Sequence, residues 1–276
     1  MRLGNNRIGL IGFLLVMLIS TISSFLEDPP EPPRSGGDTS VRRPVPTLPP
    51  EDLVGLPEFS VEIGAKGDGS GTAFAIGSGL WMTARHVVDG CDVVGIREAP
   101  RRGIRARSFS VHDSADVAVM RLDRSGPPVR VADAPPERGD IAYHVGFPRG
   151  EPGEMRSRML GLSVMSAHGR YSTREPVIAW AELERYPDDS RPLSGLSGGP
   201  VFDSQGRLIG VHVAGSIRRG RSFTAHPSSI HEMLARAGAT PSARGAVPTF
   251  TPATLPDVAD RLRDQETVVM ALCDVR

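Results

Sequence analysis

The chain has 276 residues, of which 39% are hydrophobic and 23% charged, as is usual for a soluble globular protein that can bury a core. Its 32 basic and 32 acidic residues cancel, so composition gives no electrostatic support for a nucleic-acid partner. Two cysteines are too few for a disulfide-rich scaffold, and no C-x-x-C motif or His/Cys cluster predicts a metal site.

An uncharged apolar segment lies near the N-terminus, over residues 8–26. As a helix it would span roughly 28 Å, just enough for the hydrocarbon core of a bilayer. Arg2 and Arg7 precede it and two acidic residues follow it, which favours a cytoplasmic N-terminus and an exported remainder. Residues 1–27 are therefore predicted to be a signal anchor or a cleaved signal peptide, and the sequence leaves both interpretations open.

Residues 28–57 are rich in proline and poor in apolar periodicity. Such a segment cannot bury enough apolar surface to fold alone, so we predict a semi-rigid tether. A disordered leader without a role is the alternative.

Short apolar runs separated by glycine-containing turns follow, and they are typical of β-strands because they are rich in Val, Ile and aromatic residues. The runs are "FSVEIGA", "GTAFAIG", "GLWMTARHVV", "DVAVMRL", "IAYHVGF" and "RLIGVHVAG". Many short strands at this spacing predict an all-β sandwich or barrel.

One helix is predicted late in the chain, over residues 228–237. Ser228 or Ser229 can cap its start, and Gly238 can end it. Its apolar face would hold Ile230, Met233 and Leu234. The C-terminal tail, residues 239–276, begins with a Thr/Pro-rich stretch and ends in a segment that could form a terminal helix.

The stretch "LSGLSGGPVFD" places Ser197 among glycines. It satisfies the G-x-S-x-G pattern of a nucleophile elbow, which requires a helix after the serine and then an acid and a histidine. Two glycines and a proline follow Ser197 instead, and the next residues are typical of a β-hairpin. The elbow interpretation therefore fails on its context.

A Ser–His–Asp triad is the better explanation, because a histidine and an aspartate lie upstream in a known chain order. His86 is predicted at the end of a strand and Asp116 at the start of another, while Asp113 and Asp123 lie outside the "DVAV" pattern. These segments resemble a chymotrypsin-fold (trypsin-like) serine protease of the bacterial branch that includes glutamyl endopeptidases and the high-temperature-requirement proteases. The matching motifs are "GSGTAFAIGSGLWMTARHVV", "ADVAVMRL", "VGFPRG" and "GLSGGPVFDSQGRLIGVHVAG".

The resemblance implies a protease domain over residues 58–238, with two antiparallel β-barrels over about 58–130 and 135–227 and the active site between them. His86 would be the general base and later the general acid, Asp116 would orient its imidazole, and Ser197 would be the nucleophile. The backbone N–H groups of Gly195 and Ser197 would form the oxyanion hole. This reaction needs no metal or cofactor.

Substrate binding is also implied by the resemblance. Residues 213–215 (Val213, Ala214 and Gly215) would pair with the substrate backbone. His212 lies where glutamyl endopeptidases carry a histidine that recognises an acidic side chain, as imidazolium or as a neutral donor. The alternative is that His212 only fills an inner strand position.

The cysteines allow two states. Two cysteines of an exported protein often pair. A bond between Cys91 and Cys273 would link the tail to the first barrel. The alternative is a buried Cys91 and a loose Cys273.

These features predict an exported, periplasmic serine endopeptidase that takes a polypeptide substrate, held at the inner membrane if its N-terminal segment is uncleaved. The rival interpretation is a protease-fold protein that has lost turnover and captures extended peptides at the membrane.

Overall fold

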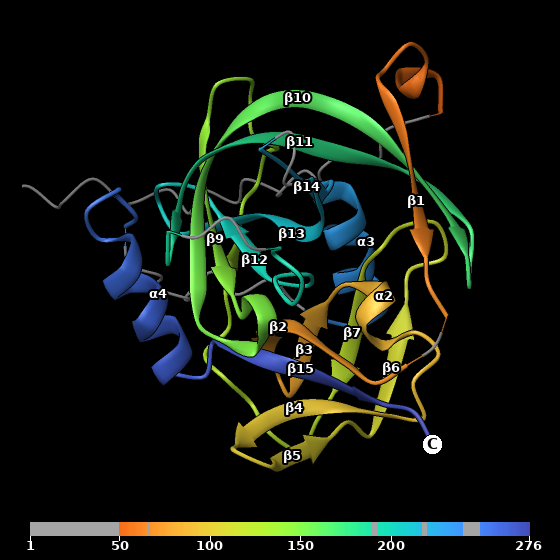
Figure 1. Ribbon diagram of the computed structural model, residues 1–276, viewed down its shortest axis with the longest axis vertical. Helices are drawn as coiled ribbons and strands as arrows, with labels where there is room; N and C mark the ends of the chain where they lie inside the picture. Colours follow the sequence, from red (N-terminus) through yellow and green to blue (C-terminus); the bar gives the residue numbers. More distant parts are fainter. Residues whose placement is uncertain (1–49, 66, 189–191, 217–219, 240–248) are drawn as a thin grey trace, which may run out of the picture. The chain divides into compact units, whose positions relative to one another are not determined.

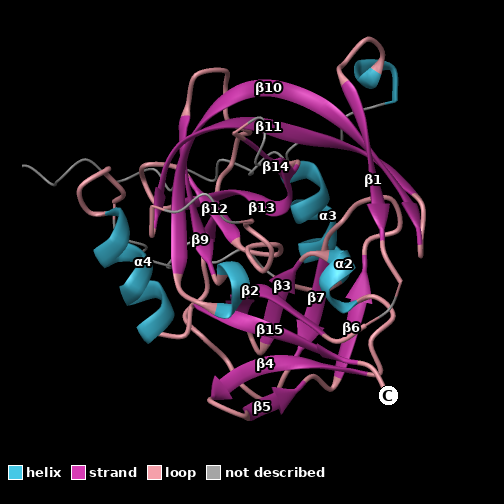
Figure 2. Ribbon diagram, in the orientation of Figure 1, coloured by secondary structure: helices cyan, strands magenta, loops and turns pink. Residues whose placement is uncertain are grey.

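The computed structural model describes residues 50–65, 67–188, 192–216, 220–239 and 249–276. All of them belong to one compact unit, residues 43–276. Strands dominate it and helices are few and short (Figure 2). The expected all-β class is therefore confirmed.

The first sheet has seven strands in the order β5-β4-β15-β2-β3-β7-β6, all paired antiparallel. It curls around a buried face to which β2 and β3 contribute almost wholly buried segments. Its strands are β2 (Gly69–Gly77), β3 (Leu80–Thr83), β4 (Val93–Ala99), β5 (Arg102–Arg105), β6 (Ser108–Val111), β7 (Ala118–Arg121) and β15 (Val268–Asp274).

The second sheet has eight strands, and six of them close on themselves because β9 pairs with both β12 and β10. The two long strands β10 and β11 arch over this barrel (Figure 1). The strands are β1 (Glu58–Ile63), β8 (Arg130–Val131), β9 (Ile141–Gly146), β10 (Gly153–Gly169), β11 (Thr173–Tyr186), β12 (Pro200–Phe202), β13 (Arg207–Ser216) and β14 (Arg221–Ala225). Two curled sheets are the expected architecture.

Short helices connect the strands: η1 (Pro50–Leu53), α2 (Arg85–Val88), η2 (Pro148–Gly150), α3 (Pro227–Arg236) and α4 (Leu255–Asp264). The helix predicted over 228–237 is α3, and the three apolar residues expected on its inner face are buried. Its N-cap differs from the prediction, since the ring of His226 accepts from Ser228 N at 3.2 Å. Gly238 follows the helix with a φ of 66°, as expected of a residue that ends one.

Strand β1 belongs to the second sheet, whereas the sequence placed it in the first barrel at 58–130. It pairs in parallel with β10, from Glu58 opposite Val164 to Ile63 opposite Gly169. Its Phe59 ring contacts Phe223 of β14 with centroids 4.1 Å apart. Alternating burial is what any half-buried strand shows, so the sequence pattern could not say which sheet β1 would join.

The C-terminal segment also differs from expectation. Residues 239–276 were predicted as a tail with a terminal helix outside the protease domain, but they form α4 and then β15, which lies between β4 and β2 inside the first sheet. A disulfide joins Cys91 to Cys273 of this strand. The run "VVMALCD" is typical of a buried strand, because β-branched and apolar residues dominate it.

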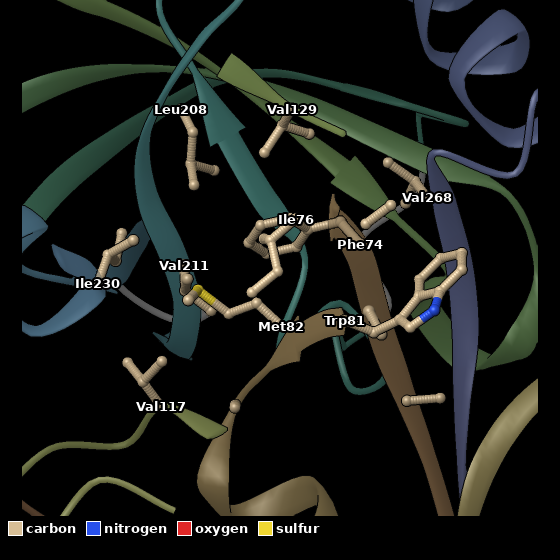
Figure 3. Close-up of a cluster of buried hydrophobic side chains, with 14 of the residues drawn as sticks. Phe74, Ile76, Trp81, Met82, Val117, Val129, Leu208, Val211, Ile230 and Val268 are labelled. Atoms are coloured by element: carbon tan, nitrogen blue, oxygen red, sulfur yellow. The ribbon is translucent and has the colours of Figure 1, made fainter. Parts of the chain in front are cut away.

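One hydrophobic core runs through both sheets. It combines Phe74, Trp81 and Met82 of the first sheet with Leu208 and Val211 of β13 (Figure 3). The two sheets therefore share buried contacts, and these contacts fix the position of one sheet against the other.

Residues 1–49, which hold the predicted signal anchor or signal peptide and most of the predicted tether, lie outside the described residues. Within the described ranges, no helix has the length and apolarity needed to span a bilayer. The last part of the predicted tether packs on the protein: Leu53 is buried, and Pro57 O accepts a hydrogen bond from Val164 N at 2.8 Å.

Candidate active site

His86 lies on the single turn of α2, three residues after β3 ends, rather than at the end of a strand. Val87 and Val88 anchor this turn, because both side chains are buried. The imidazole itself keeps 26% of its surface exposed. The helical turn therefore leaves the His86 imidazole partly exposed while its buried neighbours hold the backbone.

Asp116 lies two residues before β7 and is 1% exposed. Its Oδ2 is 2.6 Å from His86 Nδ1, and its Oδ1 accepts from His86 N at 2.8 Å. Burial alone would lower the pKa of His86, but the charge and hydrogen bond of Asp116 outweigh burial and raise that pKa above its ordinary value. The pair is thus built to accept a proton at His86 Nε2.

Ser197 lies in the turn between β11 and β12 and meets the His86 region across β2. Its carbonyl accepts from Thr72 N at 2.8 Å. A Cβ at Gly71 would lie 2.9 Å from that carbonyl and 2.7 Å from a methyl of Val87, so Gly71 separates the serine turn from α2 by one backbone thickness. Among the described residues the Ser197 hydroxyl has no hydrogen-bond partner, so it is not bonded to the His86–Asp116 pair.

Gly198 lets the serine turn lie against the strand that leads to His86. It has a φ of 84°, and a Cβ there would lie 2.2 Å from both Thr72 O and Thr83 Oγ1. No L side chain fits at that distance, and the conformation itself favours glycine. The same Cβ would be 2.8 Å from Ala84 N, which shows how closely the two segments approach.

Two backbone N–H groups beside Ser197 are available to a ligand. Ser194 O accepts from Arg149 N at 2.5 Å, and because a trans peptide points its C=O and N–H in opposite directions, the Gly195 N–H faces away from Arg149. A Cβ at Gly195 would lie 2.5 Å from Phe147 O. Within the described ranges, neither the Gly195 amide nor the Ser197 amide has an acceptor.

A pocket of about 240 Å³ opens next to Ser197. The serine turn forms one wall and the end of β13 another. Its lining residues are Glu182, Arg185, Pro192, Leu193, Ser194, Ser197, His212, Gly215, Ser216 and Arg221. Arg185 and Glu182 form an ion pair within this lining.

His212 of β13 is 2% exposed, and its Nε2 lies 3.9 Å from where a Cβ of Gly215 would be. On its other side Nδ1 is 3.4 Å from His144 Nδ1, and His144 Nε2 is 2.7 Å from Ser157 Oγ. Burial, with a smaller effect of the His86 charge, lowers the pKa of His212 to about 3. His212 is therefore neutral near pH 7, which argues against the imidazolium and leaves two alternatives, a neutral donor to the pocket or a side chain that only fills an inner strand position.

The strand end at Val213, Ala214 and Gly215 has one open edge. β14 pairs with Ala214 and Gly215 on one side, whereas the pairing of β12 with β13 ends at Val211 on the other. Beyond His212 O, which accepts from Gly198 N, that second edge has no strand partner in the described part of the chain. An extended peptide can pair with such an edge.

Sequence reasoning predicted His86, Asp116 and Ser197 as site residues but missed several residues that contact them or lie behind the pocket. Tyr171 and Glu175, which contact Asp116, and His144, which lies behind His212, carry no local motif. Only the fold brings them to the site, so no sequence signal marked them.

Comparison with known proteins agrees with this geometry. The family model described as "Trypsin-like peptidase domain" matches residues 71–211. The putative serine protease HhoA of Synechocystis sp. is 29% identical over 151 residues, which cover 53% of this chain and 37% of that protein. The probable periplasmic serine protease do/HhoA-like of Haemophilus influenzae is 26% identical over 168 residues, covering 56% of this chain and 34% of that protein. The chain thus matches only about a third of the length of these relatives.

Among solved structures, the active form of the Rv3671c protease from M. tuberculosis is similar to this chain. The TM-score is 0.51 and the sequence identity 26%, over 64% of this chain and 77% of that one.

Proposed function

We propose, from the premise that this chain belongs to the trypsin-like peptidase family, that it is a serine endopeptidase with His86, Asp116 and Ser197 as its triad. The observation that carries the proposal is the His86–Asp116 pair, joined at 2.6 Å, on a helical turn that meets the serine turn at Gly71; in the described residues the Gly195 and Ser197 amides have no acceptor. The relatives named as serine proteases support it.

The proposed reaction starts with proton transfer from Ser197 Oγ to His86 Nε2 as Oγ attacks the scissile carbonyl carbon. Asp116 stabilises the imidazolium that forms, in keeping with the raised pKa of His86. The Gly195 and Ser197 amides would hold the oxyanion. The carbon–nitrogen bond then breaks as His86 returns the proton to the leaving amine, and a water molecule repeats the sequence on the acyl-enzyme.

The Ser197 hydroxyl must approach His86 for this step, because the two side chains are not hydrogen bonded in the structure. Catalytic hydrogen bonds are often long before substrate binds and shorten in the complex. Substrate pairing with the open edge of β13 would press the scissile carbonyl into the serine turn.

Replacing the nucleophile is the test of the activity. Ser197→Ala should lower kcat for a peptide substrate by about 10⁶-fold, because the triad acts as a unit. Ser204→Ala is the matched control, since Ser204 is an exposed serine in the β12–β13 turn. Equal turnover by the wild type and Ser197→Ala would exclude Ser197 as the nucleophile.

For specificity we propose an acidic residue at the substrate position whose side chain enters the pocket. The support is a chain of contacts: Ser157 Oγ is 2.7 Å from His144 Nε2, and His144 Nδ1 is 3.4 Å from His212 Nδ1. We assign the tautomers so that Ser157 Oγ–H donates to His144 and His144 Nδ1–H to His212, which leaves His212 Nε2–H facing the pocket. A carboxylate accepts that donor, and Arg221 also lines the pocket. A peptide library should show faster cleavage after Glu than after Ala, Phe or Arg, and a flat or basic-directed profile would remove this proposal.

For location we propose an oxidising compartment outside the cytosol, with residues 1–27 as signal anchor or signal peptide and the following segment as a tether. The Cys91–Cys273 disulfide supports it, because disulfides are rare in the cytosol. The Haemophilus influenzae relative is named periplasmic. Loss of the protein from the periplasmic fraction when residues 1–27 are deleted is the expected result.

The rival proposal is a peptide-binding protein without turnover. The unbonded Ser197 hydroxyl is the observation in its favour. Tight binding of a peptide that the wild type never cleaves would establish it.

A further inference from the structure

The tip of the β10–β11 hairpin contacts both members of the His86–Asp116 pair. The hairpin belongs to the second sheet, yet Arg170 Nη2 donates to His86 O at 2.9 Å. Strand β1 holds the tip in place, since Arg170 N donates to Ile63 O at 3.2 Å and β1 pairs with β10 up to Gly169.

Tyr171, also at the tip, contacts Asp116 directly. Its hydroxyl donates to Asp116 Oδ1 at 3.2 Å, the same oxygen that accepts from His86 N. The ring lies under Arg85, whose guanidinium carbon is 4.0 Å from the ring centroid. Burial and the negative charge of Asp116 raise the pKa of Tyr171, so the hydroxyl keeps its proton and remains a donor.

Glu175 holds Asp116 from the backbone side. Its Oε1 accepts from Asp116 N at 2.7 Å, and its side chain is 1% exposed. Its Oε2 is buried and has no hydrogen-bond partner in the described part of the chain. An ionised carboxylate with a bare oxygen would be very costly there, which favours the neutral form of the Glu175 carboxyl.

The charges around this cluster agree with an uncharged Glu175. Burial and the nearby charge of Asp116 raise its pKa well above the ordinary range, although the Asp116 amide and Arg85 oppose this. Arg85 is engaged by Asp89 and by Tyr171, and Arg170 faces the His86 carbonyl. On the β13 side, neutral His212 is the titratable group that faces His86.

We propose that Tyr171 and a protonated Glu175 are positioning residues, which fix Asp116 against His86 and leave Asp116 as the one negative charge of this cluster. The inference rests on the proposed triad and assigns to the hairpin tip the orientation of its carboxylate. It also explains why the β10–β11 hairpin extends from the second sheet to the first. Through this hairpin, the sheet next to Ser197 holds Asp116, which belongs to the same sheet region as His86.

Tyr171→Phe removes one hydroxyl and keeps the ring under Arg85. Without this donor the negative charge of Asp116 is less dispersed and stabilises the imidazolium more strongly. The pKa of His86 should therefore rise by about 0.5. In the full chain, kcat/KM at pH 7 should fall about tenfold through kcat, with KM within about twofold, as expected for loss of one hydrogen bond to a charged group.

Tyr143→Phe is the matched control, because Tyr143 is a buried tyrosine of β9 that stacks on Phe250, away from Asp116. It should leave the pKa of His86 and the kinetic constants unchanged. An equal response to both tyrosine substitutions, or a loss confined to KM, would overturn the role of Tyr171.

Glu175 is tested by two substitutions that differ in one respect. Glu175→Gln keeps an acceptor for Asp116 N and cannot ionise, so the pKa of His86 should stay where it is. Glu175→Leu removes the acceptor, so the His86 Nδ1–H resonance should broaden or disappear. A lower pKa of His86 in Glu175→Gln would show that Glu175 is ionised and would overturn the proposal.

The NMR titration of His86 is made in the Ser197→Ala chain, which needs no turnover. If the wild type cleaves no peptide, the proposed function fails while this titration still reports on Tyr171 and Glu175. If Tyr171→Phe does not fold, the contrast between the two Glu175 variants decides the question alone.

Discussion

At the scale of single residues, the chemistry of the pocket depends on the protonation of His212. Because its pKa is lowered to about 3 by burial, the side chain offers a neutral N–H donor at any pH where the enzyme would work. A neutral donor prefers a carboxylate to an amide only through the charge of the substrate and of the surrounding arginines.

This leads to a prediction on the pH dependence of specificity. The ratio of kcat/KM for a Glu peptide to that for the matching Gln peptide should stay constant from pH 6 to 9, and decline only as the peptide carboxylate protonates near pH about 4.3. Titration of His86 affects both peptides equally and cancels in the ratio. A ratio that falls as the pH is raised from 6 to 7.5 would contradict this prediction, because it would mean that His212 is charged at pH 6 and loses its proton in that range.

At the scale of elements, β15 and the Cys91–Cys273 bond link the end of the chain to the first sheet, whose strand β3 leads into the helical turn with His86. Cys91 lies three residues after α2, and the bond closes a sequence separation of 182 residues. Since β15 pairs with both β4 and β2, its loss would divide the first sheet.

We predict that the Cys91→Ala/Cys273→Ala double variant loses about 5 kcal/mol of unfolding free energy by the chain-entropy model. Urea unfolding of the oxidised wild type and the double variant measures the difference. The reduced wild type is the control and should resemble the variant. A loss below about 1 kcal/mol would show that packing of β15 alone holds the tail.

The elements also show what the sequence could predict. His86, Asp116 and Ser197 could be predicted as a triad because each sits in a short motif, and the structure brings His86 and Asp116 into contact. β10 and β11 were missed because charged residues interrupt their apolar positions, and β15 was taken for part of a helix that ends at Asp264. The pairing of β1 with β10 depends on tertiary contacts such as Phe59–Phe223, which no local pattern contains.

At the scale of the whole molecule, the two sheets share a buried core, so we expect them to unfold together, and three buried histidines should report on that event. Burial lowers the pKa of His212 to about 3 and of His226 to about 4, and it lowers the pKa of His144 well below the ordinary value. Each is neutral in the folded chain and protonates in the unfolded chain below pH about 6.5.

Stability should therefore fall as pH drops from about 6.5 towards 4, by up to about 1.4 kcal/mol per pH unit for each of these histidines. His86 and Glu175 act in the opposite direction, because the folded pKa of each is raised and its contribution to stability is full at acid pH. Urea unfolding at several pH values measures the slope.

His226→Asn is the matched variant, since asparagine can still cap α3 by accepting from Ser228 N. The slope of its unfolding free energy against pH should be smaller, because about one proton fewer is taken up on unfolding. An unchanged slope would contradict a neutral His226 in the folded chain.

The central claim is that the fold makes the hydroxyl of Ser197 nucleophilic, and covalent labelling with a fluorophosphonate probe tests it most directly. Peptide mapping of the labelled wild type should find the probe on Ser197, with no labelling of Ser197→Ala and normal labelling of Ser204→Ala. Labelling should weaken at acid pH as His86 takes up a proton. A wild-type chain that stays unlabelled while fully folded, or a probe found on another serine, would contradict the account.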